Sequence, residues 1–202
     1  MGRVVRDPSS VKDRSRAGAD ERGANASAAF PCRHVDADLP QILVIPCINP
    51  HGYMHGTRAN AGGQDINRSM DETGIPIVDL LKAALDGPRF DLALDLHEDY
   101  DGEGFYLYES QDQPARFGPS IIEAVKRIGP VDCQVNEDDI PLSEGVMAIN
   151  PEWGTVGWSS YVSIRNASHT IIAETASARP MAERLGIHAC VVGEALRLLK
   201  SG

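Results

Sequence analysis

The fold is decided by two neighbouring pieces of sequence, IPCINPHGYMHGTRANAGGQDINRSM at residues 45–70 and FDLALDLHED at residues 90–99. Each piece contains an apolar run that ends in polar residues. Asn49 and His51 follow the first run, and His97 lies near the end of the second. Guanidinium, carboxylate and imidazole groups are thus delivered to the ends of two apolar runs, which is how many catalytic sites are built.

The residues around and between these pieces predict a βαβ unit. Residues 41–48, QILVIPCI, form a continuous apolar run with β-branched residues, which predicts a strand buried on both faces. Residues 75–85 carry one apolar stripe and end at Gly87-Pro88, as a helix does. Residues 90–96 predict a second buried strand. The result is an α/β fold with a parallel sheet, whose crevice lies outside the carboxyl ends of the strands.

The remaining chain is expected to continue this pattern. Residues 52–74 hold five glycines and predict a long irregular loop, a kind of loop that is usually functional. Downstream we expect a strand at 104–109, a helix at 120–128, loops at 129–156 with one short strand near 131–135, a short apolar strand at 169–173 that delivers Glu174, and a terminal helix at 180–199. Residues 1–40 show no sustained periodicity, so we predict a poorly patterned N-terminal segment followed by one domain at 41–202.

Charge and cysteine content exclude several classes of protein. The chain has 29 acidic and 19 basic residues and a net charge of -10, which argues against nucleic-acid binding because that requires a basic field. Its four cysteines are far apart and form no metal or disulfide pattern. We find neither a signal peptide nor an apolar run near the roughly 18 residues of a membrane helix. We therefore predict a cytoplasmic protein that does not bind membranes, with a small or cationic partner, and leave its oligomeric state open.

His97 is the first candidate site residue. It ends an apolar run and is flanked by Asp95, Glu98 and Asp99, a negative setting that suits a divalent cation. The alternative is a strand-end histidine that is only solvated or hydrogen-bonded. The alternation of a strand does not by itself place Asp95 in the ligand sphere of His97.

Two arginines and their neighbours form a second group of candidates. Arg58 and Arg68 lie in one glycine-rich loop, and guanidiniums suit capture of a carboxylate or stabilisation of an oxyanion. Asn67 adds an amide to the same pocket edge. Asp65 could pair with either arginine or orient a metal-bound histidine. The alternative is a pair of solvated loop arginines.

Glu174 is the candidate general base. It follows an apolar strand, where partial desolvation could raise its pKa, although strand-end glutamates are commonly only solvated. Cys47 lies inside an apolar run, so we interpret it as a core residue rather than a nucleophile.

In this order the motifs resemble the zinc carboxypeptidase family, the carboxypeptidase A-like metallopeptidases related to aspartoacylase and succinylglutamate desuccinylase. Residues 49–52 look like the family's Asn-Pro-Asp-Gly, and residues 57–68 are similar to its Arg-x-Asn and Gly-x-Asp-x-Asn-Arg segment. Asp95-Leu96-His97 matches the third-ligand motif, and residues 174–180 match the segment with the catalytic glutamate. The resemblance implies a three-layer sandwich with a mixed, largely parallel central sheet and a catalytic domain at 41–202.

The resemblance also implies roles for individual residues. His97 would bind Zn2+, Arg58 would polarise the scissile carbonyl, Asn67 and Arg68 would bind the terminal carboxylate of the substrate, Glu174 would activate the metal-bound water, Asp65 would orient a ligand histidine, and Tyr161 is the nearest candidate for the tyrosine that covers the substrate. The function implied is a zinc-dependent carboxypeptidase. Two alternatives stay open: an N-acyl amino acid deacylase of the aspartoacylase type, and a noncatalytic carboxylate-binding relative.

The sequence departs from the family at its first metal motif. The family takes two ligands from a His-x-x-Glu motif upstream of the Asn-Pro segment, and the sequence contains no His-x-x-Glu. The nearest stretch, Gly18-Ala19-Asp20-Glu21, has glycine at the histidine position, which leaves Glu21 as a candidate ligand. We therefore expect an N-terminally incomplete version of the fold that binds zinc poorly by itself.

Overall fold

The computed structural model describes residues 40–111, 116–133 and 143–201. In chain order the elements are α1 (Pro50–His55), the 3-10 helix η2 (Ile66–Arg68), α2 (Pro76–Leu85), β1 (Ala93–Asp99), β2 (Tyr106–Glu109), α3 (Gly118–Val125), β3 (Val146–Ala148), the 3-10 helix η3 (Pro151–Trp153), α4 (Trp158–Arg165), β4 (Thr170–Ala176) and α5 (Met181–Ser201). The predictions made for residues 1–39, including the metal ligand Glu21, lie outside the described residues.

Within the described residues, four strands form one mixed sheet in the order β1-β4-β2-β3. β1 pairs with β4 in parallel, β2 pairs with β3 in parallel, and β2 runs antiparallel to β4. Two rows of paired residues cross the same face of the sheet: Tyr106, Glu174 and His97 form one row, and Tyr108, Ile172 and Asp95 form the next. Side chains two residues apart on a strand share a face, so these six side chains lie together.

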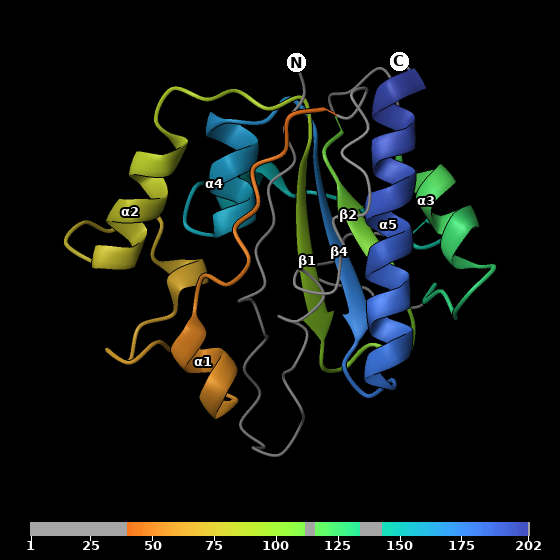
Figure 1. The fold of residues 1–202 in the computed structure, drawn as a ribbon, viewed down its shortest axis with the longest axis horizontal. Coiled ribbons are helices and arrows are strands. Elements are labelled where there is room, and N and C mark those ends of the chain that lie inside the picture. The colour runs from red at the N-terminus through yellow and green to blue at the C-terminus, as the bar shows by residue number, and fades with distance from the viewer. Residues whose placement is uncertain (1–39, 112–115, 134–142, 202) are drawn as a thin grey trace.

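Helices cover both faces of the sheet and make three layers, as predicted. α3 and α5 lie on one side and α2 and α4 on the other, with the sheet seen nearly edge-on between them (Figure 1). The first face is apolar: Leu94, Leu96, Ile171 and Ala173 pack with the buried residues of α3 and α5. Because strands alternate, Asp95, His97 and Glu174 are turned toward the α2 and α4 side, whereas Glu98 and Thr175 face α5 and contact Arg184 and His188.

The prediction of a strand at residues 41–48 is wrong. The segment belongs to no strand, and β1 ends the sheet order beside it. Ile42 and Val44 are 43% and 46% exposed, whereas Leu43 and Ile45 pack against the apolar cluster under α2 and α4. A continuous apolar run is buried on both faces only if it joins the sheet, and here the segment is buried on one side only.

Other predicted elements are confirmed with shifted bounds. The helix expected at 75–85 is α2, and the strands expected at 90–96 and 169–173 are β1 and β4. Both strands extend further than expected and keep His97 and Glu174 inside the ladder rather than beyond its end. For residues 129–156 we expected loops with one short strand near 131–135. The structure instead has β3 at Val146–Ala148, a stretch that we expected to be loop.

Candidate functional site

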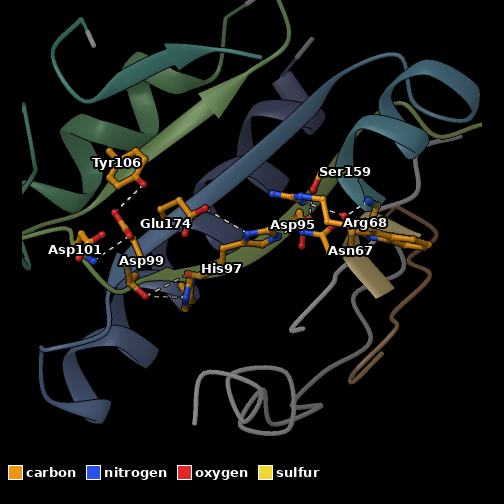
Figure 2. A network of polar contacts seen from close by, with 12 residues as sticks. Asn67, Arg68, Asp95, His97, Asp99, Asp101, Tyr106, Ser159 and Glu174 are labelled. Carbon is orange, nitrogen blue, oxygen red and sulfur yellow. Dashed lines mark hydrogen bonds and ion pairs between the residues drawn. The ribbon is translucent and has the colours of Figure 1, made fainter. Parts of the chain in front are cut away.

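The centre of the candidate site is His97, which lies between two carboxylates. Its Nε2 is 2.7 Å from Asp95 Oδ2, and its Nδ1 is 3.3 Å from Glu174 Oε1 (Figure 2). All three side chains are buried. Burial alone would lower the pKa of His97, but Asp95 and Glu174 outweigh it and raise the pKa well above its usual value. The imidazole thus has a carboxylate close to each of its two nitrogens.

The side chain of Asp95 accepts a hydrogen bond from a residue of α4, which lies in the helical layer beside the sheet. Ser159, in the first turn of α4, donates its hydroxyl to Asp95 Oδ2, the same oxygen that lies next to His97. The sequence left open whether Asp95 acts with His97; in the structure the two side chains are in contact, because residues two apart on a strand share a face. That signal was present in the sequence. Ser159 had no local signal at all, since 64 residues separate it from Asp95.

Arg58 is positioned by two contacts. Its Nε lies 2.5 Å from Asp65 Oδ2, so of the two roles considered for Asp65 the structure shows the pairing with an arginine. Its backbone carbonyl accepts a hydrogen bond of 3.1 Å from Asn49 Nδ2. Asn49 Oδ1 in turn accepts from Gly52 N at 2.9 Å and begins α1.

Gly52 is required by this arrangement. A Cβ at this position would lie 2.3 Å from Thr57 O and 2.3 Å from Asn49 Nδ2, far inside contact distance. Through these contacts the Asn-Pro-His-Gly segment at residues 49–52 fixes the position of the loop that carries Arg58.

Asn67 and Arg68 lie on the short helix η2 and face the same region. Asn67 Oδ1 accepts from Trp158 N, the first residue of α4, at 2.8 Å, which leaves its Nδ2 as the donating end. Arg68 Nη1 donates to Asn67 O at 2.9 Å. Burial and the nearby charge of Arg58 lower the pKa of Arg68, although Asp65 acts in the opposite direction. A second guanidinium close to the first, exposed at the pocket edge, favours an anionic ligand.

One pocket of about 440 Å³ connects these groups, a size typical of small-molecule sites. It brings together the predicted residues Arg58, Asn67, Arg68, His97 and Glu174, and adds Tyr108, Trp153, Val156, Gly157, Ser159, Ser160 and Ile172. Tyr161 is not among its lining residues; it packs against the apolar cluster under α2 and α4. Glu21 lies outside the described residues.

The described residues do not fit a zinc ion. Within residues 40–111, 116–133 and 143–201, no group of three or more histidine, cysteine, aspartate or glutamate side chains is arranged to hold a metal. Zinc sites in proteins need at least three protein donors. Both nitrogens of His97, the histidine that the motif resemblance assigns to the metal, also lie close to carboxylates. In the described part of the chain no helix is long and apolar enough to cross a membrane.

Comparison with known proteins gives similarity in structure alone. No family model matches the chain, and no curated protein matches it. A candidate metallopeptidase from Shewanella amazonensis is 20% identical, with a TM-score of 0.74 over 98% of this chain and 76% of that one. A candidate metallopeptidase from Shewanella baltica is 18% identical, with a TM-score of 0.76 over 98% of this chain and 76% of that one.

A third similar structure is the mDAP-bound form of Helicobacter pylori Csd4, a D,L-carboxypeptidase. It is 16% identical, with a TM-score of 0.58 over 98% of this chain and 51% of that chain. The fold of this chain is carboxypeptidase-like. At these identities the similarity concerns the fold, and this chain spans about half the length of Csd4.

Proposed function

We propose that the chain is a hydrolase of the metallocarboxypeptidase type, which cleaves an amide bond next to a free carboxylate. The observation that carries the proposal is the shared pocket: Arg58, Asn67 and Arg68 line the same 440 Å³ space as His97 and Glu174. A carboxylate-binding end and a proton-accepting group thus lie within reach of one small substrate.

Recognition of the substrate is assigned to Asn67 and Arg68. Asn67 keeps its Nδ2 as a donor because its oxygen is used by α4, and Arg68 supplies a planar guanidinium. Together they offer N–H donors of the kind that a carboxylate accepts. Arg58, oriented by Asp65, is assigned to the carbonyl that is cleaved, where its charge would stabilise a developing oxyanion.

Glu174 is assigned to proton transfer. It takes a proton from the water that attacks the carbonyl and returns it to the leaving amine, and His97 fixes the position of its carboxylate. Zinc dependence stays part of the proposal through the motif resemblance, with His97 as one ligand and Glu21 as a second. Because the described residues do not fit the ion, no step is assigned to it.

Substitution of Glu174 tests the reaction. Purified protein would be assayed, with and without added zinc, on peptides with a free C-terminus and on N-acyl amino acids. Glu174→Gln is expected to lower turnover by about 100-fold or more, because an amide cannot accept the proton. Glu183→Gln, in the first turn of α5, is the matched control and should leave turnover intact, because Glu183 pairs with Arg179 and does not line the pocket. Full activity of Glu174→Gln would show that another group is the base.

Two alternative functions remain. A deacylase of N-acyl amino acids uses the same groups and is separated by the substrate panel, since it would act on N-acyl amino acids and not on peptides. A noncatalytic carboxylate-binding protein is favoured by one observation, the lack of a three-donor metal group in the described residues. A noncatalytic protein of this kind should bind carboxylate ligands in a way that needs Arg68, and should turn over no substrate.

From the scattered cysteines we further propose that the protein acts in the cytoplasm.

A further inference from the structure

The short helix α1 carries two histidines and a methionine on its exposed face. Residues 51–55 read HGYMH, so Met54 and His55 follow His51 by three and four positions. Side chains at these spacings are neighbours on one face of a helix. All three are exposed, Met54 to 76%, whereas Gly52 is buried. Figure 1 shows α1 at the periphery of the fold, apart from the sheet. We call these three exposed residues the His-Met cluster.

The two imidazoles of the His-Met cluster already lie together. The ring centroids of His51 and His55 are 4.4 Å apart, with an interplanar angle of 43°. Among the described residues, no hydrogen bond or ion pair occupies either ring. Histidines four positions apart on one face of a helix can bind one metal ion through two nitrogens. The pair can therefore hold one ion without any change in the helix.

The backbone under the His-Met cluster is held at both ends of α1. At its start, Asn49 Oδ1 accepts a hydrogen bond from Gly52 N at 2.9 Å. At its end, Gly56 takes the left-handed conformation that glycine tolerates, with φ of 62°, and its N–H donates to Gly52 O. Thr57 N donates to the same carbonyl at 3.0 Å. An ion would therefore order only three side chains, and a preformed site loses less entropy on binding.

The ligand set of the His-Met cluster fits copper(I) better than other common cations. Thioether sulfur is a soft ligand that selects Cu(I), and imidazole suits copper, zinc and nickel. Zinc in proteins is bound by thiolate, imidazole and carboxylate groups, so the cluster offers it two of the three ligands that it needs. Calcium and magnesium take oxygen ligands, which these side chains lack. The methionine thus decides which metal the cluster prefers.

We propose that α1 binds one Cu(I) ion through a ring nitrogen of His51, a ring nitrogen of His55 and the Sδ of Met54. These three are not among the described residues that line the pocket with His97 and Glu174, so the site is separate from the proposed function. The net charge of -10 gives the protein a field that favours cations. The ion binds and leaves as Cu(I), so no electron is transferred.

Titration of the full chain with Cu(I) under anaerobic conditions tests the proposal. Thiols also bind Cu(I), so accessible cysteines are alkylated first, and binding is followed at the cluster itself by the NMR signals of the Met54 methyl group and of the rings of His51 and His55. These signals should shift together and saturate at one equivalent of Cu(I). Competition with a Cu(I)-specific chelator gives the affinity, and zinc should bind at least about tenfold more weakly.

Three substitutions at exposed positions test the ligands one by one. Met54→Leu should weaken Cu(I) binding at least about tenfold and leave Ni2+ binding unchanged, because nickel uses the imidazoles alone. His51→Gln and His55→Gln should each weaken the binding of both ions at least about tenfold. Met181→Leu, at the start of α5, is the matched control and should bind Cu(I) like the wild type.

Three outcomes would overturn the proposal. In the first, Met54→Leu binds Cu(I) as tightly as the wild type, so the thioether is not a ligand. In the second, Cu(I) binds while the signals of the His-Met cluster stay unchanged, which places the ion elsewhere. In the third, zinc binds as tightly as Cu(I), so the cluster does not select a soft ion.

Discussion

At the scale of single residues, the position of His97 depends on Asp95. Asp95 Oδ2 contacts both His97 Nε2 and the Ser159 hydroxyl, so the imidazole is held with Nδ1 toward Glu174. Carboxylates that orient a functional histidine commonly contribute 10- to 100-fold to activity. We predict that Asp95→Asn lowers turnover by roughly that factor. Kinetic assays on the best substrate would measure it.

The control is Asp86→Asn, an exposed carboxylate at the end of α2. A merely structural role is separated by NMR of the imidazole nitrogens: Asp95→Asn should change the ¹⁵N signals of His97 in a folded protein, whereas a packing defect would lower the melting temperature instead. Unchanged turnover with unchanged ¹⁵N signals would show that Asp95 does not position His97.

At the scale of elements, Glu109 joins the end of β2 to the start of α3. Its Oε1 accepts from Phe117 N at 2.6 Å and Gly118 N at 3.0 Å, and from His169 Nε2 at 2.9 Å. Arg116 Nε lies 2.7 Å from Oε2. Burial alone would raise the pKa of Glu109, but the hydrogen bonds from His169, Arg116 and the two backbone amides outweigh it and hold the pKa below its usual 4.5.

Because the pKa of Glu109 is lower in the folded state, its stabilisation is present above pH 4.5 and is lost as the pH falls through the folded-state value. We predict that Glu109→Gln lowers the free energy of unfolding at pH 7 by about 3 kcal/mol. We also expect a smaller loss of stability for this variant between pH 5 and pH 3 than for the wild type. Urea unfolding at several pH values would measure both, and parallel pH profiles would contradict the assignment.

At the scale of the whole molecule, the chain is expected to bind zinc weakly. Among the described residues no group of three or more histidine, cysteine, aspartate or glutamate side chains could hold a metal ion, and a zinc site needs at least three protein donors. We predict that zinc titrated into the chain binds more weakly than micromolar. Calorimetry would measure the affinity, and His97→Ala would show whether any weak site includes this residue. A submicromolar one-to-one site would refute the prediction and would mean that donors such as His34, His51 or His55 take part.

The sequence by itself determined those features of the fold and of the site that short-range patterns encode. The stripe at 75–85 predicted α2, the apolar runs at 90–96 and 169–173 predicted β1 and β4, and residue type selected Arg58, Asn67, Arg68, His97 and Glu174, all of which line the pocket. Each of these features depends on neighbours within a turn or a strand, so it can be deduced locally.

Only the tertiary structure decided which distant groups meet. Asn67 caps α4 from 91 residues away, and Ser159 holds Asp95 from 64 residues away. The tertiary structure also decided the strand register that pairs His97 with Glu174. It likewise placed residues 41–48 beside the sheet and not in it. No local pattern specifies such contacts, because they form only when packing of the layers brings the segments together.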